Sequence, residues 1–305
     1  MSTLHVLMPP FSGAADASAL RHWLAHGDRM PGLANARVAV LRECFRVPGA
    51  ALPVAALRHH CHAGDAENGA WLCADPAWVR SEATGARLMA CPVDDVSATE
   101  AAQLAALLRP LFGDAGVALA VDTPAAWCVH LERGAPPVTL THPVDALGAS
   151  LIECLPAGEA GSKWRHLFNE AQVALHAHPV NAARIAAGKR PINALWFWGE
   201  GPLPDSVETR LRYVASADDV LRGLAKVAGA ASVEPSPEVL ADRRGGGDVL
   251  LDLDAPGSVG GLAAWLASFR RCLRERRFDA VVLAFSSGER FRVRHAHRLR
   301  FWRRA

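Results

Sequence analysis

A short segment near the middle of the chain combines side chains that suit an anion. Asn181 and Arg184 follow Pro179, and on a helix beginning there they lie one turn apart and project toward one spot. The Arg guanidinium presents a planar set of donors to a carboxylate or phosphate, and a helix N-terminus favours negative charge. Asn193 follows on a loop before an apolar strand, and His178 precedes the helix. This spacing predicts a pocket for an anionic small molecule.

The same residues also fit a structural interpretation. Asn181 would then cap the helix, and Arg184 would form an ordinary surface ion pair. On the preceding helix, Asn169, Gln172 and His176 fall near one face, which suits either a pocket wall or a half-exposed surface. Both interpretations stay open from the residues alone.

Histidines near residue 60 suggest a metal but do not make a site by themselves. His59 and His62 share a helix face, whereas adjacent helical residues diverge by about 100°. Two ligands are too few for a zinc site. Solvation of a helix end is therefore the favoured interpretation.

A second histidine pair lies near the C-terminus. His295 and His297 alternate on an expected strand and so share one face. With Asp252 or Asp254 they form an alternative set of metal ligands, which we rank below a metal-free surface.

Arginines dominate the last part of the chain. After about residue 286 we expect a basic hairpin whose charged face carries Arg292, Arg294, Arg298 and Arg300. Charges on an edge strand discourage pairing with other chains, and this is the favoured role. A nucleic-acid surface is the alternative, but the segment lacks interleaved exposed aromatic residues or a recognised module.

The pattern of elements predicts an α/β fold with a mixed or mostly parallel sheet flanked by helices. Ser97-Ala-Thr-Glu100 forms a capping box that starts a helix. Residues 194–198 are apolar and aromatic between chain-breaking residues, which indicates a buried strand. The strand 249–253, helix 261–277 and strand 280–285 form a βαβ unit.

Composition favours a folded protein of the cytosol. Of 305 residues, 50% are hydrophobic and 21% charged, and the net charge of +2 gives no general attraction to nucleic acid or membrane. No apolar run approaches the ~20 residues of a membrane span. The seven cysteines are scattered, which fits neither a disulfide framework nor a zinc ribbon.

One segment resembles a known family. It runs from His178-Pro-Val-Asn181 through Arg184 and Gly188 to Trp196-Phe-Trp-Gly199 and Gly201. The pattern is similar to the archaeal-type cofactor-independent phosphoglycerate mutases of the alkaline phosphatase superfamily, and closer still to the related RpfE-type regulatory proteins of bacteria. The resemblance implies a reduced mutase-like fold.

The resemblance also implies a domain arrangement and a second contact residue. Residues 1–70 and 194–305 would form the α/β core, and residues 71–193 an inserted α/β region like a substrate domain. The segment Asp75-Pro-Ala-Trp-Val-Arg80 is similar to one whose Arg helps hold the mutase substrate. Here Glu82 follows closely, and its carboxylate would disfavour a nearby phosphate.

The catalytic parts of the mutases are not apparent in this sequence. Those enzymes hold two metal ions through Asp and His residues and use a Ser nucleophile. After the first strand this chain reads Met8-Pro9-Pro10 without a carboxylate, and the turn after Asp254 contains no His. Two-metal phosphoryl transfer needs such ligands.

We therefore expect a non-catalytic mutase-like protein without a cofactor or bound metal, which binds an anionic small molecule or acts in regulation. Its candidate ligand-binding residues are Arg80, His178, Asn181, Arg184 and Asn193. One alternative is an active metal-dependent phosphoglycerate mutase or phosphatase. The other is a module that binds a protein partner through the Trp-rich segment or the basic hairpin.

Overall fold

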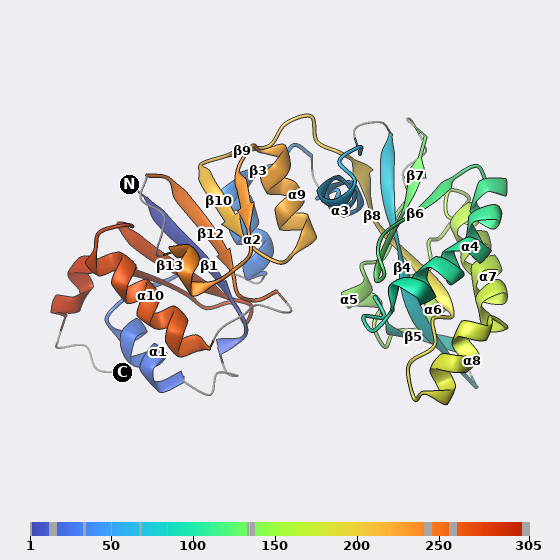
Figure 1. The fold of residues 1–305 in the computed structure, drawn as a ribbon, viewed down its shortest axis with the longest axis horizontal. Helices are drawn as coiled ribbons and strands as arrows, with labels where there is room; N and C mark the ends of the chain where they lie inside the picture. The colour runs from blue at the N-terminus through green and yellow to red at the C-terminus, as the bar shows by residue number, and fades with distance from the viewer. Residues whose placement is uncertain are drawn as a thin grey trace. The chain divides into compact units, whose positions relative to one another are not determined.

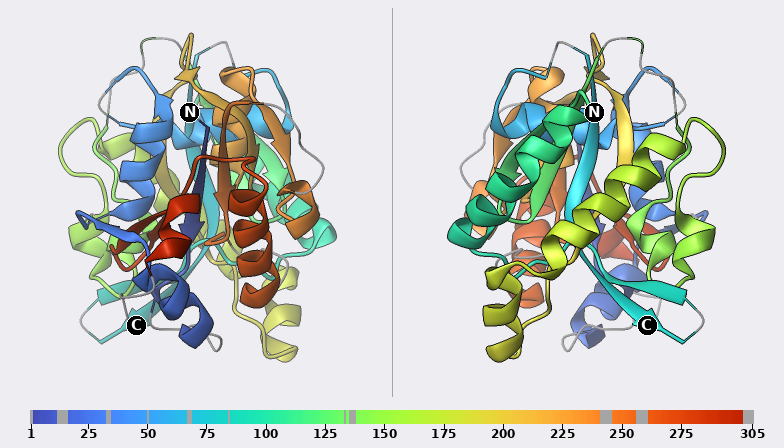
Figure 2. Two further views of the ribbon diagram at one scale, coloured as in Figure 1. Left: turned by 90° about the vertical axis from the view of Figure 1, so that its left-hand side faces the viewer. Right: turned by 90° about the vertical axis from the view of Figure 1, so that its right-hand side faces the viewer.

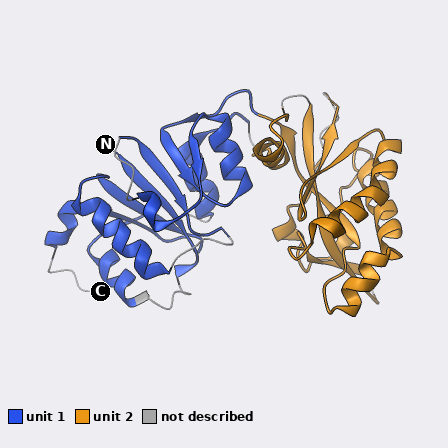
Figure 3. Ribbon diagram, in the orientation of Figure 1, with its two compact units in different colours: residues 1–49, 204–305 blue, residues 50–203 orange. Residues whose placement is uncertain are grey.

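The computed structural model divides the chain into two compact units (Figure 3). Unit 1 contains residues 1–49 and 204–305, and unit 2 contains residues 50–203. The structure describes residues 2–11, 17–32, 35–49, 51–66, 69–83, 85–132, 134, 138–240, 246–255 and 261–300. Unit 2 is thus an insertion into unit 1.

Unit 1 is built on a seven-stranded sheet whose order is β11-β10-β12-β1-β13-β14-β2. The first five strands in this order are parallel, and β14 and β2 are antiparallel additions at one edge. The bounds are β1 (Thr3–Met8), β2 (Asp28–Met30), β10 (Leu211–Ala215), β11 (Ala231–Val233), β12 (Asp248–Asp252), β13 (Ala280–Phe285) and β14 (Arg290–Arg294). The predicted mostly parallel sheet is confirmed for this unit.

Helices cover both faces of this sheet (Figure 1). They are α1 (Ala17–Ala25) and α10 (Leu262–Arg274) on one face, and α2 (Ala36–Cys44) and α9 (Asp219–Val227) on the other. Leu20, Trp265 and Phe269 pack on the apolar side chains of the central strands. The unit also contains two short 3-10 helices, η2 (Pro237–Leu240) and η3 (His295–Leu299).

Unit 2 contains a five-stranded antiparallel sheet around the long strand β4 (Ala70–Glu82). The other strands are β5 (Gly85–Ala90), β6 (Ala118–Thr123), β7 (Ala126–Leu131) and β8 (Ala194–Pro202). Its helices are α3 (Val54–His62), α4 (Ala98–Asp114), α5 (Pro143–Ala146), α6 (Leu151–Cys154), α7 (Ser162–His176) and α8 (Pro179–Ala186).

The two faces of the unit 2 sheet have different cores. On one face, α4 and α7 bury a large cluster that includes Phe112, Trp164 and Phe168 (Figure 2, right). On the other, α3 packs through small side chains against Trp71 and Cys73. The predicted capping box of α4 is confirmed, because Ser97 Oγ accepts from the Glu100 N–H and the Glu100 carboxylate accepts from the Ser97 N–H.

The ends of unit 2 leave unit 1 side by side. In unit 1, β3 (Phe45–Arg46) pairs antiparallel with β9 (Glu208–Thr209), immediately outside the insertion. Within unit 2, Gly201 approaches Pro53 so closely that an added Cβ would lie 2.7 Å from the proline Cβ. Both units therefore hold the two chain crossings together.

The domain bounds expected from sequence differ from those observed. They fall at 70/71 and 193/194, whereas the units change at 49/50 and 203/204. The reason is packing: α3 contacts β4 and β8, and β8 pairs with β4 along most of its length. Residues 50–70 and 194–203 consequently belong to the insertion.

The expected C-terminal hairpin is shorter than predicted. β14 ends at Arg294, and the chain turns into η3 at His295. Arg298 and Arg300 therefore do not continue the strand face of Arg292, which corrects the prediction of one four-arginine face. The buried strand around residue 196 is confirmed, since Trp196 is 2% exposed.

Candidate functional site

The carboxyl ends of the parallel strands in unit 1 carry a cluster of charged residues. Ligands of open α/β sheets bind at this edge. Asp252, the last residue of β12, is 0% exposed. Arg37 of α2 donates to both of its oxygens, from Nη1 to Oδ1 at 3.1 Å and from Nη2 to Oδ2 at 3.0 Å. Arg37 also lies 3.0 Å from the carboxylate of Asp218.

The Asp252 carboxylate accepts further hydrogen bonds. The hydroxyl of Ser216 donates to Oδ2 at 2.9 Å, and the backbone N–H groups of Asp254 and Ala255 donate to Oδ1 at 3.1 and 3.2 Å. A carboxylate offers about four lone-pair directions. Five donors fill them, so Asp252 cannot bind a metal ion unless Arg37 leaves.

The remaining groups at this edge are also engaged. Ser216 Oγ accepts from the Asp218 N–H while it donates to Asp252, so its proton is already used in a hydrogen bond. Burial raises the pKa of the Asp254 carboxyl, although Arg37 opposes this rise. The positive charge that faces these carboxylates is the guanidinium of Arg37. The role of Arg37 could not be predicted from the sequence, because no local pattern links it to a strand 215 residues away.

The alternative metal set of His295 and His297 with Asp252 or Asp254 is contradicted by the topology. β14 runs antiparallel to β13, and its last residue, Arg294, pairs with Ala280 at the amino end of the parallel sheet. η3 follows there, whereas Asp252 ends β12 at the opposite edge. His297 lies 3.4 Å from Asp28 instead.

Arg184 and Asn181, the main predicted anion ligands, are buried inside unit 2. Arg184 is 1% exposed and donates to the carbonyl of Arg190 at 2.8 Å and to Glu100 Oε1 at 3.0 Å. It also binds both the carbonyl and the carboxylate of Asp95. Burial would raise the pKa of Glu100, but hydrogen bonds from Ser97 and Arg184 lower it. Arg184 therefore ties α8 to the start of α4.

Asn181 and Asn193 act as backbone bridges. The Asn181 amide donates to the carbonyls of Leu175 and Ile192 and accepts from the Ile192 N–H, each at 2.8 Å. Asn193 exchanges two hydrogen bonds of 2.8 Å with the backbone of Val79. The donors that the sequence assigns to an anion thus bind the chain itself.

The other two predicted residues have local partners as well. His178 caps α8, where its Nδ1 accepts from the Val180 N–H at 3.2 Å. Arg80 is exposed and donates to Glu82 at 2.9 Å, and Arg87 donates to the same carboxylate. Hydrogen bonds from Arg87 and Arg80 lower the pKa of Glu82. The structure does not bring Arg80 together with Arg184 in any described contact.

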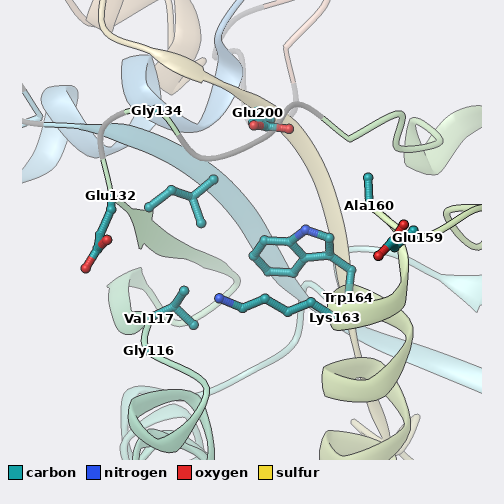
Figure 4. A pocket seen from close by; sticks show the side chains of 10 residues that line it. Gly116, Val117, Glu132, Gly134, Glu159, Ala160, Lys163, Trp164 and Glu200 are labelled. Carbon is teal, nitrogen blue, oxygen red and sulfur yellow. The ribbon is translucent and has the colours of Figure 1, made fainter.

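Unit 2 has a pocket of about 720 Å³ with acidic character (Figure 4). Glu132, Glu159 and Glu200 line it, and Lys163 extends alongside the Trp164 ring. Burial raises the pKa of Glu200. Three carboxyl groups against one ammonium make this pocket a poor match for an anion.

Unit 1 has a basic pocket of about 330 Å³ between α1, the end of α10 and η3. Its charged and polar lining residues are His22, His26, Arg270, Arg274, Arg294, His295, His297 and Arg298. None of the described residues that line it is acidic. Arg274, Arg294 and Arg298 form no ion pair within the described chain. This pocket has the charge that the predicted anion requires.

Together, the parallel sheet, its helices and the inserted antiparallel unit define an α/β fold. Over 95% of its length the chain superposes on the PH0037 protein from Pyrococcus horikoshii, with a TM-score of 0.52 and 13% identity, covering 86% of that protein. A cofactor-independent phosphoglycerate mutase from Thermoplasma acidophilum aligns with a TM-score of 0.48.

Part of the sequence is similar to curated 2,3-bisphosphoglycerate-independent phosphoglycerate mutases. The Methanosarcina barkeri enzyme is 37% identical over 99 residues, which cover 31% of this chain and 25% of the enzyme. The Methanothrix thermoacetophila enzyme is 34% identical over 125 residues, covering 39% of this chain and 32% of the enzyme. No family model matches the chain. The chain is phosphoglycerate mutase-like, and the match spans about a quarter to a third of these relatives.

Proposed function

We propose that this protein is a mutase-related binding protein that does not carry out metal-dependent phosphoryl transfer, and that it serves a regulatory role through an anionic small molecule. The observation that supports this most is the Arg37–Asp252 pair. A guanidinium already neutralises the carboxylate at the sheet edge, and the surrounding donors fill its lone pairs. The resemblance to RpfE-type proteins agrees with regulation.

An assay of phosphoglycerate interconversion with added Mn²⁺ or Zn²⁺ tests the first half of the proposal. We expect no turnover above that of an Asp252→Asn variant. Metal-dependent turnover that Asp252→Asn abolishes would establish the alternative, an active mutase or phosphatase. A circular dichroism spectrum of the variant provides the control for folding.

For the anion we propose the basic pocket of unit 1. Arg274, Arg294 and Arg298 present positive charge that no described carboxylate offsets. Guanidinium groups bind carboxylate and phosphate in two-point contacts. The ligand class is therefore a small carboxylate- or phosphate-bearing molecule.

Calorimetric titration with inorganic phosphate and with citrate tests this assignment. We expect weak, salt-sensitive binding that falls at least about tenfold in an Arg274→Gln/Arg294→Gln double variant, since each lost contact is worth about 1 kcal/mol or more. Arg109→Gln, which removes an exposed charge on α4 in unit 2, should leave the affinity unchanged. Equal binding by the double variant would show that the pocket is not the site.

The alternative of a partner surface on the Trp-rich strand has less support. Trp196 and Phe197 are buried, and the indole N–H of Trp198 donates to Asp75 at 2.8 Å. An exposed apolar patch is the usual mark of a partner surface, and this strand does not offer one.

No described helix is both long and apolar enough to cross a bilayer.

A further inference from the structure

Three side chains from three elements of unit 2 converge on the α3 face of its sheet. His59 comes from α3, Asp122 from β6 and Cys128 from β7. The His59 Nδ1 lies 2.7 Å from Asp122 Oδ1 and 3.4 Å from Cys128 Sγ, and the thiol lies 3.4 Å from Asp122 Oδ2. Imidazole, carboxylate and thiolate are the ligands that zinc takes in proteins.

The spacing of these atoms suits a tetrahedral ion. Zinc bonds of about 2.0–2.3 Å place neighbouring ligand atoms roughly 3.3–3.6 Å apart. Both distances from the sulfur already equal 3.4 Å. The distance from nitrogen to oxygen is that of a hydrogen bond, and it would widen by roughly half an ångström around an ion. The change lies within the reach of side-chain rotation.

The second ring nitrogen of His59 lies beside a carboxylate, as is typical of metal-binding histidines. Its Nε2 lies 2.9 Å from Asp65 Oδ1, an ion-pair distance, although the N–H is not aligned for a directed hydrogen bond. A carboxylate behind the second ring nitrogen fixes the tautomer that leaves Nδ1 to a metal. Trp71 stacks on the ring with centroids 3.6 Å apart. The ring is therefore held in place before any ion binds.

Small apolar side chains enclose the cluster. Ala55, Ala56 and Ala66 pack around it, and Cys128 is 2% exposed. The side chains of His59 and Asp122 are 6% and 5% exposed. Buried polar side chains are costly unless they have partners, and a bound ion would give all three a partner at once.

We propose that His59, Asp122 and Cys128 bind one thiophilic divalent cation such as Zn²⁺, with water in the fourth position. Burial raises the pKa of the Cys128 thiol, and binding expels that proton to solvent because the sulfur binds as thiolate. Three protein ligands and an open position are typical of reactive rather than purely structural zinc sites. The site belongs to unit 2 and does not depend on the proposed function of unit 1.

In the sequence, His59 has only His62 as a ligand at helical spacing, which gives two ligands. Asp122 and Cys128 come from strands more than 60 residues later, and no local spacing connects them to α3. The proposal therefore departs from the expectation, drawn from the sequence, that the chain binds no metal.

Cobalt titration of the chelator-treated full-length protein tests the proposal. Co²⁺ should bind with one equivalent and produce the near-ultraviolet charge-transfer absorption of a cobalt–thiolate bond. Cys128→Ser should abolish this band, and Asp122→Asn should weaken the affinity at least tenfold. Cys91→Ser, which removes a free thiol elsewhere in unit 2, should leave the band intact.

Zinc-dependent thermal stability provides a second measurement. Zinc should raise the melting temperature of the wild type and of Cys91→Ser, but not that of Cys128→Ser. The metal-free melting curves show whether Cys128→Ser folds, and Asp122→Asn gives an independent result if it does not. Absence of a thiolate band in the wild type, or an equal band and an equal zinc effect in Cys128→Ser, would refute the proposal and leave a hydrogen-bonded network without an ion.

Discussion

In each unit, an arginine donates hydrogen bonds to both carboxylate oxygens of a buried aspartate. In unit 1 the pair is Arg37 and Asp252, with distances of 3.1 and 3.0 Å. In unit 2 it is Arg58 and Asp75, with two distances of 2.9 Å. Both aspartates are 0% exposed. The two pairs are nearly identical in chemistry.

Their surroundings differ. Arg58 is only 13% exposed, and Asp75 lies mid-strand beneath the Trp198 indole and the Trp127 N–H. Arg37 is 28% exposed and shares its charge with Asp218 at the sheet edge. The same ion pair is thus part of a core in one unit and lies at the carboxyl edge of the parallel sheet in the other. Position relative to strand ends, more than residue type, decides which.

The largest expected effect comes from breaking the core pair. Arg58→Met should lower the free energy of unfolding by about 3–5 kcal/mol, because it leaves the Asp75 charge buried without its partner. Urea denaturation followed by tryptophan fluorescence measures this. The double variant Arg58→Met/Asp75→Asn should recover part of the loss; a single-variant loss below about 1 kcal/mol would contradict the assignment.

A smaller effect is expected at the sheet edge. Arg37→Met should cost about 1.5–3 kcal/mol, since Asp252 keeps the Ser216 hydroxyl and two backbone donors. The same denaturation experiment compares the two units directly. A cost equal to or above that of Arg58→Met would erase the distinction between core and edge.

The smallest effects concern pH, in the metal-free protein. Burial would lower the pKa of His59, but the carboxylates of Asp122 and Asp65 outweigh it and raise that pKa above its ordinary 6.5. The folded state then binds the extra proton, so stability falls as pH rises from about 6.5 through the folded value.

In unit 1 the corresponding window is acidic. Burial raises the Asp254 pKa above its ordinary 3.8, so stability again falls as pH rises, but starting near 3.8. Denaturation midpoints against pH should lose the neutral slope in His59→Gln and the acidic slope in Asp254→Asn. If either variant removed both slopes, the two regions would not titrate separately.

Local features of this molecule could be predicted from sequence, and contacts between distant elements could not. The capping box at Ser97 and the buried strand at Trp196 depend on neighbours within a few residues, and both are confirmed. Arg184 carried the right chemistry for an anion, but its spacing could not reveal Asp95, which lies 89 residues earlier and binds it. Asp75 illustrates the same limit, because its partner Arg58 lies 17 residues earlier on another element and no local spacing links the two.

The paired ends of the insertion have a consequence for how unit 1 can fold. The entropy lost on closing a loop depends on the distance its ends must be brought together and on the freedom of the chain between them. Here β3 pairs with β9, and Gly201 lies against Pro53, so unit 2 once folded presents its two ends already adjacent. For the folding of the parallel sheet, the insertion from residue 50 to 203 then behaves as a short hairpin connection. Its length therefore adds little to the loop-closure entropy that unit 1 loses on folding.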